Sequence, residues 1–288
     1  MIILFLSILT SCSLTLIFKL FQKYEVENFL AIVVNYITAA ILCYTISNEK
    51  IDIIILLKQE WFPSALVIGL LFISLFNLVA FSAQRVGIAI TSVATKISLC
   101  IPVLFSYYYF DDTFNTFKII GIILALLSIY FTARKKGQQH FKSSIYILVP
   151  LILFLSSGCL DILFVYSMKT FELVSKGLEL TFSATLYAVA ASVGTPILLF
   201  KLFSGQRIKR QTLFGGLGLG LMNVFSIVLF LKCLDKFPES SFVFPIHNMS
   251  IVVLSALAAS LLFNEKLSKT NLIGIVIALV SIFLISSS

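Results

Sequence analysis

Charged side chains are scarce in this sequence: Asp, Glu, Lys and Arg make up 12% of its 288 residues. Average soluble domains carry about twice that fraction. Together with a hydrophobic content of 59% and a mean hydropathy of +1.07, this scarcity excludes a soluble globular protein. Cysteine motifs are missing as well, because the five cysteines show no CxxC or metal-ligand spacing. We therefore expect small packing residues at these positions, and neither a metal nor a cofactor.

Long apolar runs are what the sequence has instead. A helix needs about twenty apolar residues to cross a bilayer, and such runs recur along the whole chain. We therefore expect an all-α integral membrane protein, multi-pass in the plasma or inner membrane, with ten transmembrane helices. The expected spans are residues 2–20, 28–47, 62–83, 87–108, 115–133, 144–167, 178–202, 212–232, 240–262 and 270–286. The first lacks a basic n-region and an A-x-A-like cleavage site, so we expect a permanent helix rather than a signal peptide.

Basic residues outnumber acidic ones, 21 to 13, but they stand mostly singly at the ends of the expected spans. This is the ordinary use of Lys and Arg at a membrane interface. The expected partners are thus the lipid bilayer and a small-molecule substrate, and not nucleic acid. Odd-numbered connections carry more Lys and Arg than even-numbered ones, which favours both termini outside.

Two segments of the sequence match at a constant spacing. Shifting FDDTFNTFKIIGIILALLSIYF, residues 110–131, by 153 superposes it on FNEKLSKTNLIGIVIALVSIFL, residues 263–284. The matched positions include an acid, a glycine and a serine: Asp112 with Glu265, Gly121 with Gly274, and Ser128 with Ser281. The shift divides ten helices into two halves of five, residues 1–137 and 138–288. Because five is odd, the second half enters the membrane from the opposite side, which predicts an inverted repeat with a ligand site between the halves.

The second of these segments resembles the end of an EamA domain, from the drug/metabolite transporter superfamily. That domain ends in a short Glu-containing turn and a helix with an early Gly. PESSFVFPIHN, residues 238–248, is similar to the start and mid-helix Pro of the domain's fourth helix. The resemblance implies a transporter with two EamA repeats and cytoplasmic termini, against the charge count, so both orientations stay open. The first half departs from the pattern, since Asp111 and Asp112 stand where a Gly-Glu pair is usual and residues 92–96 lack a counterpart of Pro245.

Lys96 and Asp161 lie well inside expected spans. A charge at the bilayer centre costs about 3 kcal/mol, so each side chain should face protein or a watery cavity. His247 and Asn248, one turn beyond a mid-helix proline, correspond roughly to Lys96 in the repeat. We predict a substrate site made of six polar residues: Lys96, Asp161, His247, Asn248, Ser92 and Asn35.

Within this site, Lys96 would bind an anionic group, and Asp161 would bind a cationic group or carry a coupled proton. The structural alternative is a buried Lys96–Asp161 ion pair that only fixes helix packing. Other mid-span amides, Asn77 and Asn223, are expected to form interhelical hydrogen bonds. The GGLGLG run, residues 215–220, follows no strand and predicts close helix contact rather than a phosphate loop.

These features favour a secondary transporter, and not an enzyme, that exports a small polar metabolite such as an amino acid by alternating access. One alternative is a non-transporting or lipid-binding membrane scaffold. Another is an intramembrane hydrolase using Asp161 and His247. The chain has neither paired intramembrane acids nor an H-E-x-x-H or G-x-S-x-G motif, which disfavours the hydrolase.

Overall fold

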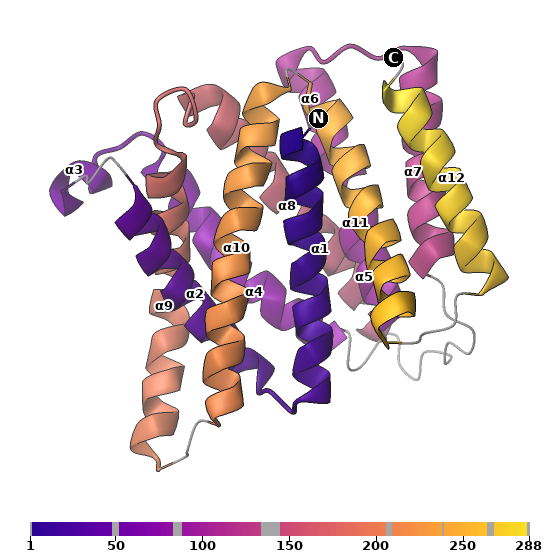
Figure 1. Cartoon of the computed structure of the whole chain (residues 1–288). Coiled ribbons are helices and arrows are strands. Elements are labelled where there is room, and N and C mark those ends of the chain that lie inside the picture. Colours follow the sequence, from indigo (N-terminus) through magenta and orange to yellow (C-terminus); the bar gives the residue numbers. More distant parts are fainter. Residues whose placement is uncertain are drawn as a thin grey trace. The chain divides into compact units, whose positions relative to one another are not determined.

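A computed structural model describes residues 2–47, 52–82, 88–133, 145–205, 209–237, 239–263 and 268–286. These residues form twelve α-helices and no strand (Figure 1), so the all-α expectation is confirmed for the described part of the chain. The helices are α1 (Ile2–Lys23), α2 (Asn28–Ile46), α3 (Ile53–Leu57), α4 (Phe62–Ser82), α5 (Ile88–Ile97), α6 (Cys100–Phe110), α7 (Thr116–Ala133), α8 (Ile145–Phe171), α9 (Glu179–Phe203), α10 (Arg210–Lys236), α11 (Ser240–Phe263) and α12 (Lys269–Ser286).

Six of the described helices are long and apolar enough to cross a membrane, namely α2, α4, α8, α9, α10 and α11. Helices α1, α7 and α12 contain shorter apolar stretches, Ile2–Phe18, Thr116–Thr132 and Lys269–Ile285. This pattern is typical of a multi-pass membrane protein, whereas the total of ten spans stays a prediction. Helix α3, five residues long, was not expected from the sequence.

The expected span 87–108 is wrong as a single helix, because Ser98 and Leu99 form a turn between α5 and α6. Pro102 supplies the physical reason. It has no N–H group, and its ring clashes with a helical carbonyl four residues earlier, which here belongs to Ser98. The N–H of Ile101 donates to the carbonyl oxygen of Ser98 at 2.9 Å, a tighter spacing than in an α-helix.

The helices form two compact units, each of which contains segments from both halves of the sequence. Unit 1 comprises Met1–Ser74 and Tyr166–Asp235, and unit 2 comprises Leu75–Val165 and Lys236–Ser288. A compact unit need not coincide with a repeat, so the division into residues 1–137 and 138–288 stays a prediction.

In unit 1, glycines allow close approach of α10 to α2. A Cβ atom added at Gly216 would lie 2.7 Å from the carbonyl oxygen of Ala31, and one at Gly220 would lie 2.8 Å from that of Asn35. Ordinary side chains would therefore force the two helices apart. The prediction that the GGLGLG run serves helix contact is confirmed for these two glycines.

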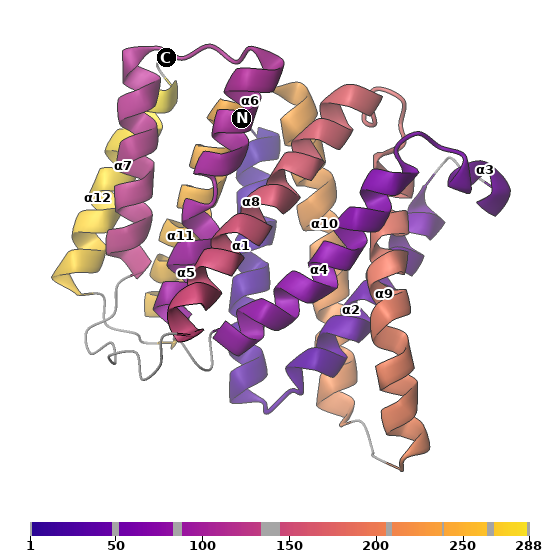
Figure 2. The same ribbon diagram turned by 180° about the vertical axis from the view of Figure 1, so that it is seen from behind.

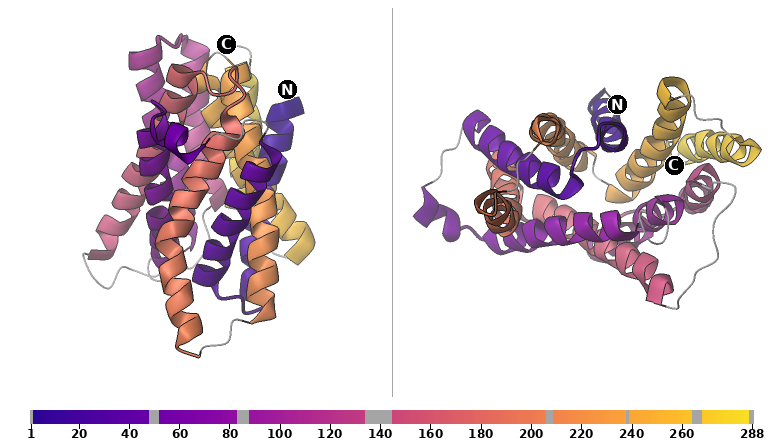
Figure 3. Two further views of the ribbon diagram at one scale, coloured as in Figure 1. Left: turned by 90° about the vertical axis from the view of Figure 1, so that its left-hand side faces the viewer. Right: turned by 90° about the horizontal axis from the view of Figure 1, so that it is seen from below.

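In unit 2, α7 and α12 lie side by side (Figures 1 and 2, and the right-hand view of Figure 3). A Cβ atom at Gly121 would lie 2.6 Å from the side chain of Ile285, and one at Gly274 would lie 2.5 Å from the backbone nitrogen of Thr132. The hydroxyl of Ser281 donates to the carbonyl oxygen of Gly121 at 2.7 Å. Early residues of one helix thus meet late residues of the other, so the pair is antiparallel. The two contacts are equivalent under the repeat: the sequence offset of 153 places Gly121 on Gly274 and Thr132 on Ile285.

Candidate functional site

Lys96 lies in the last turn of α5, directly before the break between α5 and α6. Its ammonium donates a hydrogen bond to Oδ1 of Asn248 on α11, at 3.0 Å. The end of a helix suits a cation, because its unbonded carbonyl groups carry partial negative charge. The hydrogen bond to Asn248 shows that, within unit 2, the ammonium is directed toward α11.

Asp161, on α8, brings a second charge into the same unit. Its carboxylate interacts electrostatically with the Lys96 ammonium. Among the described residues, however, no hydrogen bond or direct ion pair joins the two side chains, and the hydrogen bond from Lys96 goes to the neutral amide of Asn248. The two opposite charges are neighbours without being in direct contact.

Helix α8 presents its small residues to α6 one turn before Asp161. A Cβ atom added at Gly158 would lie 2.3 Å from the side chain of Ile101, so the two helices nearly touch there. The neighbouring Ser157 is 7% exposed. Its hydroxyl has no hydrogen-bond partner, although many helical serines bond a carbonyl three or four residues earlier. Residues 157 and 161 are four apart, so they share one face of α8.

His247 and Asn248 are both buried on α11, within the turn that follows Pro245. Asn248 stands 152 residues after Lys96, close to the repeat offset of 153. Two residues at roughly equivalent places in the predicted repeat therefore contact each other. The structure places Lys96, Asp161, His247 and Asn248 in one unit.

The remaining predicted site residues are Ser92 and Asn35. The side chain of Ser92 lies outside the described residues. Asn35 is buried in unit 1, where its Oδ1 accepts a hydrogen bond from Nδ2 of Asn223 at 3.1 Å. This contact confirms the interhelical hydrogen bond expected of Asn223. A role of Ser92 or Asn35 in substrate binding stays a prediction.

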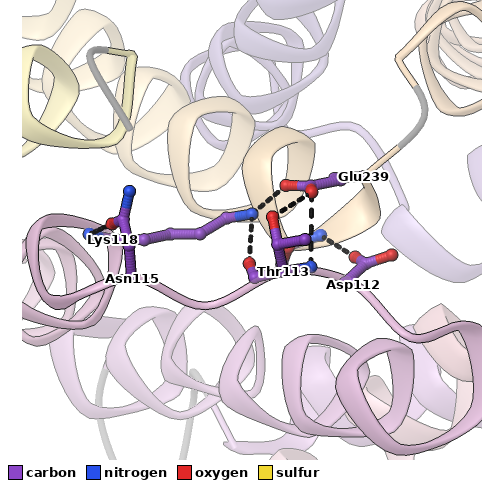
Figure 4. A network of polar contacts seen from close by, with 6 residues as sticks. Asp112, Thr113, Asn115, Lys118 and Glu239 are labelled. Carbon is purple, nitrogen blue, oxygen red and sulfur yellow. Dashed lines mark hydrogen bonds and ion pairs between the residues drawn. The ribbon is translucent and has the colours of Figure 1, made fainter.

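A second polar network, which the sequence analysis did not predict, surrounds the start of α11 (Figure 4). The Asp112 carboxylate accepts a hydrogen bond from the backbone N–H of Ser241 at 2.9 Å. Glu239 accepts hydrogen bonds from the backbone and the hydroxyl of Thr113 and pairs with the Lys118 ammonium. The loop before α7 is thereby fixed to the first turn of α11, the helix that carries Asn248.

Burial makes the Glu239–Lys118 pair unusual among the ion pairs of the described residues. The Lys118 side chain is 3% exposed and that of Glu239 is 30% exposed. Partial burial by itself would raise the pKa of Glu239, but hydrogen bonds from Lys118 and Thr113 outweigh it and hold the pKa below its usual value. The sequence offered one signal for this network, a lysine inside the expected span 115–133.

Comparison with known proteins identifies the family of this chain. The model of the EamA-like transporter family matches residues 144–287, half of the chain. The chain belongs to this family. An uncharacterized protein of Haemophilus influenzae is 29% identical over 287 residues, which cover 96% of this chain and 94% of the relative. A solved crystal structure has a TM-score of 0.77 at 14% identity, over 98% of this chain and 94% of its own, and this likeness shows the fold alone.

The EamA-like match confirms the family that the sequence segments resembled. It also supports, at the level of the family, a membrane transporter and not an enzyme. The matched residues include Asp161, His247 and Asn248, whereas Lys96 precedes them. In this EamA-like protein, the contact between Lys96 and Asn248 joins a residue outside the match to one inside it.

Proposed function

We propose that this EamA-like protein is a secondary transporter that exports a small polar metabolite, an amino acid or a related compound, across the cell membrane. It would cross the bilayer ten times, as two inverted five-helix halves, residues 1–137 and 138–288. Access to the substrate site would alternate as one half rocks against the other. The sequence contains no nucleotide-binding motif, which favours coupling to a proton gradient or to exchange over coupling to ATP hydrolysis.

The observation that carries the proposal is the hydrogen bond from Lys96 to Asn248, with Asp161 close enough to interact electrostatically. Ionisable residues inside membrane-spanning segments are costly, and they commonly mark substrate or ion pathways. A lysine that served packing alone would be expected to pair directly with the acid. Here its described hydrogen bond goes to the neutral amide of Asn248. The Lys96 ammonium and the Asp161 carboxylate can therefore each still bind a ligand.

Two helix pairs support the inverted repeat. In the α7–α12 pair, the two glycine contacts are equivalent under the sequence offset of 153, as described above. In unit 1, the aromatic rings of Tyr36 on α2 and Tyr187 on α9 stack with their centres 6.1 Å apart. These tyrosines begin matching Y-x-x-A-A segments at an offset of 151: Tyr36, Ala39 and Ala40 with Tyr187, Ala190 and Ala191. Equivalent residues that face each other are expected near a two-fold axis relating two repeats.

In this mechanism Lys96 binds an anionic group of the substrate. Asp161 binds a cationic group or carries a coupled proton. Asn248 positions the Lys96 ammonium through its carbonyl oxygen, since an ammonium donates in three directions and Asn248 takes one of them. His247, which is buried and precedes Asn248 on α11, is assigned a further polar contact with the substrate.

Efflux and uptake in vesicles test the proposal. Metabolites excreted by bacteria that express the protein are compared with those of an empty-vector strain, and the compounds enriched in the medium are then loaded into proteoliposomes. Lys96→Ala should reduce the transport rate at equal expression by on the order of tenfold or more, because the substrate loses its counter-charge in a membrane-buried site. Lys176→Ala is the matched control, since Lys176 lies on the surface beside Glu172.

Unchanged transport kinetics in Lys96→Ala would remove Lys96 from the site. An identical set of excreted compounds with and without the protein would instead favour a non-transporting scaffold. The proton role of Asp161 predicts that Asp161→Asn abolishes flux driven by a pH gradient while exchange persists. Gradient-driven flux in that variant would refute the role.

A further inference from the structure

We propose that one end of unit 1 is a binding site for the headgroup of phosphatidylethanolamine, a membrane lipid with a primary ammonium and a phosphate. Glu179 binds the ammonium, and Trp61 and Lys232 bind the phosphate. These three residues belong to unit 1, whereas Lys96 and Asp161 belong to unit 2. The site concerns recognition of the bilayer, so it goes beyond the proposed transport function and does not depend on it.

The end of α2 and the starts of α4 and α9 meet at this site. The hydroxyls of Ser47, directly after α2, and Thr181, in the first turn of α9, share a hydrogen bond of 2.9 Å. The indole ring of Trp61, directly before α4, packs edge-on against the ring of Phe182, with the ring centres 5.7 Å apart. Because the ends of membrane-spanning helices lie near the membrane–water interface, the site is at the depth of lipid headgroups.

Glu179, the first residue of α9, supplies an acceptor that no described residue uses. The residue is buried, and its Oε2 atom has no hydrogen-bond partner. Its Oε1 atom lies 3.6 Å from the ammonium of Lys232 on α10, which is too far for a hydrogen bond. A buried carboxylate oxygen without a donor is costly, so the site favours a ligand with N–H groups. The Lys232 side chain is 43% exposed, which leaves the carboxylate approachable beside it.

Trp61 supplies the complementary group, an unused donor. Its side chain is almost fully buried, and its Nε1 atom has no hydrogen-bond partner among the described residues. Buried tryptophans usually find a partner for this N–H group. Phe182, which Trp61 contacts, lies one turn after Glu179 on α9, so the unused donor and the unused acceptor are neighbours. A phosphate oxygen can accept from both the indole N–H and the Lys232 ammonium.

The surface next to these groups is apolar, which favours a lipid over a soluble ligand. Helix α3, which precedes Trp61, stands outside the other helices of unit 1 (Figures 1 and 2). The α3 side chains of Ile54, Ile55 and Leu57 are more than half exposed, as is Ile46 at the end of α2. Exposed isoleucine and leucine side chains at a membrane interface are expected to contact acyl chains. The site therefore combines a place for acyl chains with a place for a charged headgroup.

Three common phospholipids differ in how well they fit these groups. Phosphatidylethanolamine offers N–H donors to Glu179 and a negative phosphate to Lys232. Phosphatidylcholine has the same charges, but its quaternary ammonium has no N–H group and cannot donate to the carboxylate. Phosphatidylglycerol adds a negative charge without a cation, and the Glu179 carboxylate repels it. Charge and hydrogen bonding together thus select phosphatidylethanolamine.

Fluorescence quenching tests the inference, because Trp61 is the one tryptophan of the sequence and lies in the site itself. The full-length protein in detergent micelles is titrated with the three phospholipids, which carry identical brominated acyl chains that quench indole emission. Half-maximal quenching by phosphatidylethanolamine should need about tenfold less lipid than quenching by the other two, because it alone makes a charge-assisted hydrogen bond to Glu179. Glu179→Gln should remove this preference. Glu27→Gln is the matched control and should keep it, since Glu27 precedes the opposite end of α2 and pairs with Lys201.

Trp61→Phe keeps an aromatic ring and removes the N–H donor, so it is measured by native mass spectrometry of the protein with bound lipid. This variant should bind phosphatidylethanolamine about tenfold more weakly than wild type. Equal quenching of wild type by the three lipids would overturn the inference, and stronger quenching by phosphatidylglycerol would replace it with a site for anionic lipid. A preference for phosphatidylethanolamine that persists in folded Glu179→Gln would overturn it as well. The wild-type comparison needs no variant, so it decides the inference even where Glu179→Gln does not fold.

Discussion

The ion pair between Glu239 and Lys118 offers the sharpest test of how the start of α11 is held. Glu239→Gln keeps the shape of the side chain and removes its charge. The Lys118 ammonium, almost fully buried, would then retain as described neighbours the carbonyl oxygen of Thr113, at 2.9 Å, and the ring of Phe114, whose centre is 5.5 Å away. It cannot reach water without leaving its site. We therefore expect Glu239→Gln to remove a charge-assisted hydrogen bond that water cannot replace.

The size of the effect follows from burial. Hydrogen bonds to charged groups contribute about 1.5–3 kcal/mol, and the partial exposure of Glu239 screens some of this, so Glu239→Gln should lower the free energy of unfolding by about 1–2 kcal/mol. The chain contains a matched exposed pair, Glu25 with Lys209, whose side chains are 82% and 60% exposed. Glu25→Gln should change the free energy of unfolding by less than about 0.5 kcal/mol.

Unfolding in mixed detergent micelles, followed by the loss of helical circular dichroism, measures both variants. A third variant, Lys118→Met with Glu239→Gln, removes both charges and should recover most of the lost stability, because no unpaired buried charge remains. Equal destabilisation by Glu239→Gln and Glu25→Gln would refute the reasoning. So would a double variant less stable than Glu239→Gln alone.

Two further predictions concern pH and helix contact. Because the folded-state pKa of Glu239 lies below its unfolded value, the ion pair stabilises the fold above the unfolded pKa, and this contribution is lost as the pH falls through the folded pKa. On acidification, wild type should thus lose more stability than Glu239→Gln, and parallel curves in unfolding titrations would contradict this. A Cβ atom at Gly274 meets the backbone of Thr132, whereas one at Gly218 meets nothing within 4 Å. Gly274→Ala should therefore be less stable than Gly218→Ala by about 1–3 kcal/mol in the same assay, and equal stability would mean that α7 and α12 pack more loosely.

Much of the fold could be predicted from hydropathy alone. The ends of α2, α4, α7, α8, α9, α11 and α12 agree with the expected spans within a few residues. This accuracy has a simple cause, since a run of apolar residues bounded by polar ones is a local property of the chain. The break after α5 was predictable as well, but only if the effect of Pro102 on the carbonyl of Ser98 had been weighed.

The polar contacts were harder to predict. Lys96, Asp161, His247 and Asn248 stood out because charged and polar groups are rare in apolar helices. Their arrangement did not follow from that rarity. The sequence is compatible with a direct Lys96–Asp161 pair, whereas in the structure the Lys96 ammonium donates to Asn248. The buried Lys118 was missed because it lies only three residues inside an expected span, where a lysine ordinarily reaches the interface.

Hydropathy along the chain predicts most of the helices and those apolar enough to cross a membrane, and the match at an offset of 153 is likewise visible in the sequence. The rotation of each helix about its axis, and therefore the pairing of its polar side chains, becomes visible only in the folded protein. The physical reason is that a membrane helix is apolar on its lipid-facing and its protein-facing sides alike. No amphipathic pattern then marks the buried face of the helix. Its rotation is set by contacts between residues far apart in the chain, such as Gly121 with Ile285 and Lys96 with Asn248.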